Sequence, residues 1–169
     1  YPEKVCVVSA ILTKATINQY YTSKCKTLFV IYYMFMDKKI GLFWLRDDFR
    51  ITKNLGLYEA TKNHNQVVVF YLYKEKSYQN QEAQKWWLSK SLYNFKKKLS
   101  NLNINLEIIK AESYKVFFDK LSSKNNISIY WNKVYEPDYL KFDEYLFKDL
   151  KNKRISFKIC KGNVLNEID

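Results

Sequence analysis

Apolar and polar positions follow two different periods along this chain, and the two periods alternate. Apolar runs rich in β-branched and aromatic residues, typical of strands buried on both faces, predict strands at 39–45, 66–72, 104–110, 127–131 and 156–160. Apolar residues spaced three and four apart predict helices at 55–62, 82–100, 112–124 and 139–151. The clearest stripe, in the second helix, is Leu88, Leu92, Phe95, Leu99 and Leu102.

A strand followed repeatedly by a helix is typical of right-handed crossovers and of a parallel sheet covered on both faces. We therefore expect an α/β domain over residues 38–166: a Rossmann-like, doubly wound five-stranded parallel sheet. Residues 1–35 show no sustained period. We expect them to be an upstream extension or a mistaken reading, with Met36 as the natural start. The longest apolar run, 28–36, is far shorter than the roughly 20 residues that a membrane-spanning helix needs.

The formal net charge of +12 comes mostly from lysine, because only Arg46, Arg50 and Arg154 are arginines. Such basicity suits a nucleic-acid partner through counterion release. It equally suits solvated lysines spread over helix faces. Arginine, whose guanidinium binds phosphate through two hydrogen bonds, is scarce here, which favours the second interpretation and leaves DNA as a candidate.

The sequence lacks the motifs of several common kinds of binding site and active site. The three glycines form neither a dinucleotide-binding nor a P-loop pattern, and no nucleophile elbow is present. His64 is the single histidine, and its place between two asparagines favours a solvated turn residue over a base or ligand. Cys6, Cys25 and Cys160 lie far apart, which favours free thiols in a reducing, cytoplasmic compartment over disulfides or zinc. We expect no metal site.

The most informative stretch is 40–54, a buried strand that ends abruptly in fixed charge. Strand ends of an open α/β sheet are where ligands bind, so Arg46, Asp48 and Arg50 are candidate site residues. Two interpretations stay open. Asp48 would sit between the two guanidinium groups and brace the loop, which we favour, or the loop would border a ligand crevice.

This stretch also resembles the opening of the DNA photolyase/cryptochrome family, in which Trp-(Phe/Leu)-Arg-x-Asp-(Leu/Phe)-Arg precedes an Asn and a Leu-rich helix. The matching residues are Trp44, Leu45, Arg46, Asp48, Phe49, Arg50, Asn54, Leu55 and Leu57. Residues 83–92 are similar to the family's Trp-Trp-Leu helix, although Trp87 and Leu88 also suit plain packing on the sheet. Residues 132–137 resemble its Asn-x-x-Tyr-Glu-Pro exit from the fourth strand. The resemblance covers about four-fifths of the chain.

The resemblance implies an antenna-type domain of a deoxyribodipyrimidine photolyase, the bacterial enzyme that repairs cyclobutane pyrimidine dimers in DNA. Catalytic FAD, the DNA cleft and the electron-transfer tryptophans would belong to a helical domain beyond Asp169, so no residue of this chain is expected to be catalytic. We expect this chain to be a fragment that is inactive on its own, is a monomer and has no membrane partner. A cryptochrome photoreceptor, and a stand-alone Rossmann-like nucleotide-binding or interaction module, are the alternatives.

The resemblance also implies an antenna chromophore of deazaflavin or folate type at the carboxyl edge of the sheet. Folate-binding members carry an acidic residue where this chain has Tyr139, which counts against folate. The residues expected at this edge are Arg46, Asp48, Arg50 and Glu136, with Trp86 and Tyr135 as aromatic walls.

Overall fold

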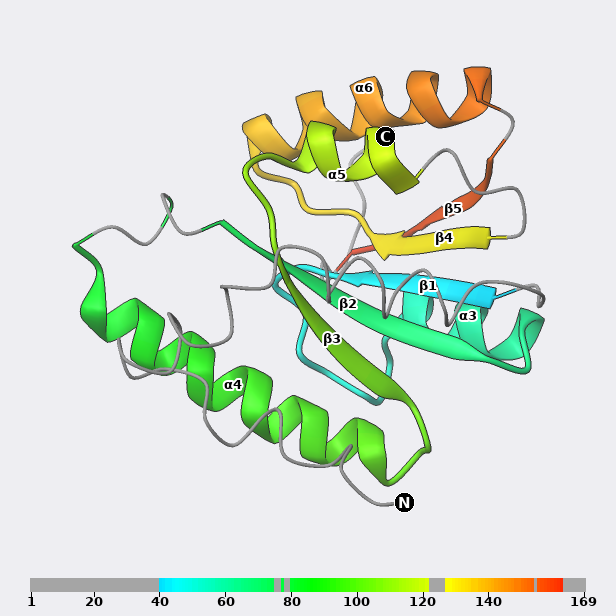
Figure 1. Ribbon diagram of the computed structural model, residues 1–169. Coiled ribbons are helices and arrows are strands. Elements are labelled where there is room, and N and C mark those ends of the chain that lie inside the picture. Colours follow the sequence, from blue (N-terminus) through cyan, green and yellow to red (C-terminus); the bar gives the residue numbers. More distant parts are fainter. Residues whose placement is uncertain (1–39, 75–76, 78–79, 122–126, 154, 163–169) are drawn as a thin grey trace.

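Five parallel strands form one sheet in the order β3-β2-β1-β4-β5 (Figure 1). The computed structural model describes residues 40–74, 77, 80–121, 127–153 and 155–162, so the expectations for residues 1–35 and Met36 lie outside the described residues. The strands are β1 Ile40–Leu45, β2 Val67–Tyr73, β3 Asn105–Lys110, β4 Ile127–Asn132 and β5 Ser156–Cys160. The doubly wound, five-stranded α/β fold expected from the sequence is confirmed.

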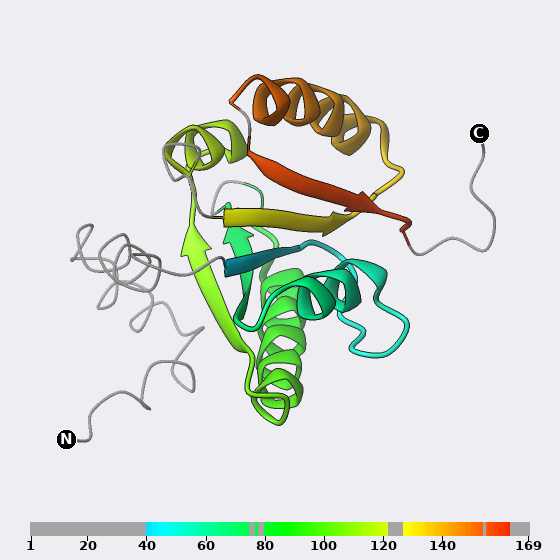
Figure 2. The ribbon, with the colours of Figure 1, turned by 90° about the vertical axis from the view of Figure 1, so that its right-hand side faces the viewer.

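Helices cover both faces of the sheet, as Figures 1 and 2 show. One face carries α3 Leu55–Asn63 and α4 Glu82–Ser100, and the other carries α5 Tyr114–Leu121 and α6 Pro137–Asn152. Successive side chains of a strand point to opposite faces. In β1, Phe43 therefore enters the core under α3 and α4, whereas Trp44 enters the core under α5 and α6. No helix among the described residues is long and apolar enough to cross a membrane.

The element boundaries agree with the expected ones to within two residues, apart from α5. This helix begins at Tyr114 rather than 112 and is described as far as Leu121. Helix α6 begins at Pro137, two residues early, because the fixed φ of proline suits the first helical position. Leu102 was wrongly placed in the apolar stripe: it follows the end of α4 and is 51% exposed.

His64 is half-buried rather than solvated. Its Nε2 shares a 3.0 Å hydrogen bond with the Tyr130 hydroxyl, and the two rings meet edge to face. A Cβ added at Gly41 would lie 2.8 Å from the imidazole. The glycine at the start of β1 therefore makes room for a histidine that joins the end of α3 to β4.

Candidate functional site

The sheet has a topological switch point between β1 and β4. The chain leaves β1 for α3 on one face and leaves β4 for α6 on the other, so a crevice opens between the carboxyl ends of the two strands. A hollow of about 140 Å³ lies there. Small-molecule pockets usually measure roughly 300–1,000 Å³, so this hollow would seat one part of a ligand. It is lined by Phe43, Trp44, Arg46, Asp47, Asp48, Asn132, Lys133, Val134 and Tyr135.

A second, smaller hollow of about 70 Å³ lies on the other side of the loop that follows β1. Arg46 and Asp47 line both hollows, and Lys74, Tyr114 and Tyr139 belong to the second alone. Tyr139 has a raised pKa, mainly because burial disfavours the phenolate, with a hydrogen bond from Tyr114 acting in the opposite direction. The position where folate-binding relatives are expected to carry an acidic residue is therefore a neutral phenol here.

Arg46 forms a buried, two-pronged ion pair with Asp143 of α6. Its Nη1 donates to Asp143 Oδ2 at 3.1 Å, and its Nη2 binds Oδ1. The guanidinium carbon lies 4.0 Å from the ring centroid of Trp44, and Nε has no partner among the described residues. The expectation that Asp48 sits between two guanidinium groups is therefore wrong, because Arg46 turns to the other face of the sheet.

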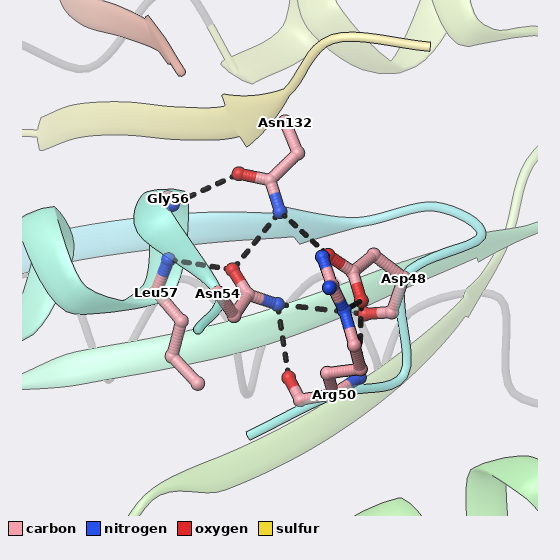
Figure 3. A network of polar contacts seen from close by, with 6 residues as sticks. All are labelled: Asp48, Arg50, Asn54, Gly56, Leu57 and Asn132. Carbon is pink, nitrogen blue, oxygen red and sulfur yellow. Dashed lines mark hydrogen bonds and ion pairs between the residues drawn. The ribbon is translucent and has the colours of Figure 1, made fainter. Parts of the chain in front are cut away.

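Of the arginines that the structure describes, Asp48 binds only Arg50. Nε and Nη2 of Arg50 each donate to this carboxylate at 2.7 Å, and the Arg50 backbone N–H adds a 3.2 Å bond (Figure 3). The Asn132 amide, from the end of β4, donates to the same carboxylate at 3.3 Å. Asp48 thus braces the loop after β1, as the favoured interpretation expected, but with one arginine and one amide.

Two asparagines hold the start of α3 against this loop (Figure 3). Asn54 caps the helix by accepting from Leu57 N at 3.0 Å, the usual role of an N-cap residue. Asn132 donates to Asn54 Oδ1 at 3.0 Å and accepts from Gly56 N at 2.8 Å. A Cβ at Gly56 would lie 2.6 Å from Asn132 Oδ1, so this helix start needs glycine.

Asp47 is the carboxylate of this loop without a guanidinium partner among the described residues. Its pKa is raised, first because neighbouring groups shield the carboxylate from water and second because Glu136 repels its charge. The guanidinium of Arg46 acts in the opposite direction. Glu136 itself is the N-cap residue of α6, and its side chain makes no capping bond.

The structure brings only part of the predicted edge together. Arg46, Asp48 and Tyr135 line the hollow between β1 and β4. Glu136 does not line it, but its charge helps to raise the pKa of Asp47, which does. Arg50 does not line the hollow, but it forms an ion pair with Asp48, which does. Trp86 is 64% exposed on α4 and lines neither hollow, so its role as an aromatic wall of an antenna site stays a prediction.

Sequence reasoning also missed three polar residues of this site. Asn132, buried at the end of β4, was matched to the family motif but not expected at the site, although a polar residue closing an apolar strand could have indicated it. Asp143 interrupts the inward stripe of its helix, and an acid there signals a buried partner. Asp47 was overlooked because its two charged neighbours matched a known motif.

Similarity to known proteins agrees with this fold. The DNA photolyase family model matches residues 41–169. A deoxyribodipyrimidine photo-lyase of Agrobacterium fabrum is 25% identical over 124 residues, which cover 73% of this chain and 26% of that protein. The chain therefore spans about a quarter of the length of this relative.

Two solved structures share the architecture. The crystal structure of a bacterial class III photolyase from Agrobacterium tumefaciens gives a TM-score of 0.67 at 23% identity, over 78% of this chain and 27% of that one. The second is an archaeal photolyase from Sulfolobus tokodaii, solved with two FAD molecules and described as implying a novel light-harvesting cofactor. It gives a TM-score of 0.60 at 20% identity, over 76% of this chain and 30% of that one. With most of its length matched by the family model, the chain belongs to the DNA photolyase family, of which it carries the N-terminal α/β domain.

Proposed function

We propose that this chain is the antenna-type domain of a deoxyribodipyrimidine photo-lyase, a carbon–carbon lyase that splits cyclobutane pyrimidine dimers in DNA. The observation that carries the proposal is the family match over residues 41–169, joined to a relative of that name about four times longer than the matched segment. FAD, bound in a helical domain outside residues 38–166, would supply the light-driven electron transfer. The relative's name favours repair over a cryptochrome or a stand-alone module.

Within this proposal, the hollow between β1 and β4 holds one part of an antenna chromophore of deazaflavin or folate type. The residues present fit such a group. Tyr135 offers an aromatic wall, and Asp48 and Asn132 offer polar edges. The buried Nε–H of Arg46 is a hydrogen-bond donor without an acceptor among the described residues. These groups would bind and orient a chromophore without performing bond chemistry. The neutral Tyr139 counts against folate.

Repair is tested with the longest protein that contains this chain. Its purified form, illuminated with an oligonucleotide that holds one cyclobutane dimer, is expected to restore the pyrimidines, whereas residues 36–169 alone restore none. Repair by the short chain, or its absence in a FAD-loaded longer protein, would contradict the proposal. Fractionation and sizing of the longer protein test the cytoplasmic location and monomeric state that we also infer.

Antenna binding is tested by titrating deazaflavin and folate into the same protein and recording the action spectrum of repair. Tyr135→Ala and Lys133→Ala should weaken chromophore binding and remove the sensitised band while repair excited through FAD persists. Trp86→Ala is the matched aromatic control, because Trp86 lines neither hollow. Equal loss in Tyr135→Ala and Trp86→Ala would place the antenna elsewhere.

A further inference from the structure

The lysines of this chain are not spread evenly over its helices. Helix α4 carries five lysines and one acidic residue. Helix α6, which covers the opposite face of the sheet (Figure 1), carries three lysines and four acidic residues. An even layer of solvated lysines, the interpretation favoured from composition, does not describe this distribution. The basic charge of the described helices concentrates on α4.

The same helix exposes large aromatic rings. Trp86, Trp87 and Tyr93 are 64%, 59% and 51% exposed, although α4 is held on the sheet by a full apolar stripe on its other side. The Lys90 ammonium lies 5.8 Å from the ring centroid of Trp86. Helical spacing of four, three and four residues places cations and rings in alternation along one side. We call this side the α4 stripe: Trp86, Lys90, Tyr93 and Lys97.

The lysines of the stripe are available to a partner. Elsewhere on α4, Lys85 is paired with Glu82, and Lys96 is partly buried beside Glu107, with its pKa lowered by burial. Lys90 and Lys97, by contrast, have no acidic partner in the part of the chain that the structure describes. Their charges are therefore not neutralised within the domain.

We propose that the α4 stripe binds single-stranded nucleic acid without sequence preference. Lysine ammonium groups would neutralise phosphates and release counterions, while exposed rings would stack on unpaired bases. The stripe runs over twelve helical residues, whose eleven rises give a length of about 16 Å, which suits a short site of a few nucleotides. A duplex hides its base faces, so the rings favour a single strand. The proposal does not rest on the proposed antenna, because Trp86 lines neither hollow.

The test measures binding of the 169-residue chain to a fluorescently labelled 12-nucleotide poly-dT by anisotropy over a salt series. Trp86→Ala with Tyr93→Ala should weaken binding about thirtyfold or more, as loss of stacking on two bases predicts. Lys90→Gln with Lys97→Gln should reduce the slope of log K against log salt by about 1.4, since each phosphate contact to a single strand contributes about 0.7.

Helix α3 offers a matched control. Tyr58 is 57% exposed, and the Lys62 ammonium lies 5.9 Å from its ring centroid, so the pair repeats the chemistry of Trp86 and Lys90 outside the stripe. Tyr58→Ala and Lys62→Gln should leave binding unchanged. A loss equal to that of the stripe variants would overturn the proposal.

Two further outcomes would also overturn it. One is equal affinity for a 12-base-pair duplex, and the other is equal competition by polyglutamate or by phosphatidylserine vesicles, because either would show charge attraction without base recognition. Failure here is distinguishable from failure of the proposed photo-lyase function. Antenna binding and the sensitised band of repair by the longer protein respond to Tyr135→Ala, repair excited through FAD responds to neither variant, and the poly-dT affinity responds to Trp86→Ala.

Discussion

Two arginine–carboxylate pairs lie close together at the end of β1, and they differ in burial. The Arg46–Asp143 pair is almost fully buried, with side-chain exposures of 4% and 8%, and joins β1 to α6. The Arg50–Asp48 pair lies within one loop, and its arginine side chain is 41% exposed. The same two residue types therefore form one pair inside the core and one at its edge.

The difference shows that proximity in sequence does not decide how much an ion pair matters. A buried charge that loses its partner stays desolvated and unpaired, whereas an exposed charge regains water. Arg46 is thus tied to the fold of the whole domain, and Arg50 to the shape of one loop.

The largest effect is expected from Asp143→Ala. The variant leaves the Arg46 guanidinium buried without its carboxylate and should lower the free energy of unfolding by about 3–5 kcal/mol. Urea denaturation of the 169-residue chain measures this. Combining it with Arg46→Met removes the stranded charge and should recover part of the loss. A loss below about 1 kcal/mol in Asp143→Ala would mean that the pair is not buried in solution.

The next effect concerns the amide that links Asp48 to α3. Asn132→Ala leaves the Gly56 N–H without its acceptor and removes donors to Asn54 and Asp48. Loss of stability should be about 1–3 kcal/mol, the cost of unsatisfied buried groups. Asn152→Ala, at an exposed position of α6, is the control for the substitution type. Similar melting curves for the two variants would contradict the network in Figure 3.

Arg50→Ala should cost about 0–1 kcal/mol, because the guanidinium is exposed and its charge attraction is weakened by water. The difference from the parent chain should shrink further in 1 M salt, where screening is strong. Thermal unfolding at low and high salt measures both effects. A cost as large as that of Asp143→Ala would remove the contrast between the two pairs.

The smallest effect is expected from Asp47→Asn and has a defined pH dependence. The raised pKa of Asp47 means that the folded state holds its proton more tightly than the unfolded state. The contribution of Asp47 to the free energy of unfolding is therefore largest below its ordinary pKa of 3.8, and it is lost as the pH rises through the pKa of the folded state. The free energy of unfolding of the asparagine variant should therefore equal that of the parent chain near pH 3. At pH 7 it should be higher than that of the parent by up to about 0.5 kcal/mol. A lower stability at pH 7 would reverse the sign.

The sequence determined the elements and their order. Strands β1 and β2 are continuous apolar runs, and α4 spans the range 82–100 that was predicted for it, because backbone periods of 2 and 3.6 act over short distances. The motif after β1 and the exit from β4 also indicated the family, and they placed Asp48 and Tyr135 at the correct edge of the sheet.

Only the tertiary structure decided which groups meet. Arg46 was expected beside Asp48, yet it binds Asp143, 97 residues further along the chain. Trp86 was expected as an aromatic wall of the site, yet its ring is exposed on α4 and lines neither hollow. Such choices depend on where each helix crosses the sheet and on which side chains lose water there, and residue spacing along the chain carries neither quantity. The sequence by itself thus determined the scaffold and its family, while burial in three dimensions decided the partners.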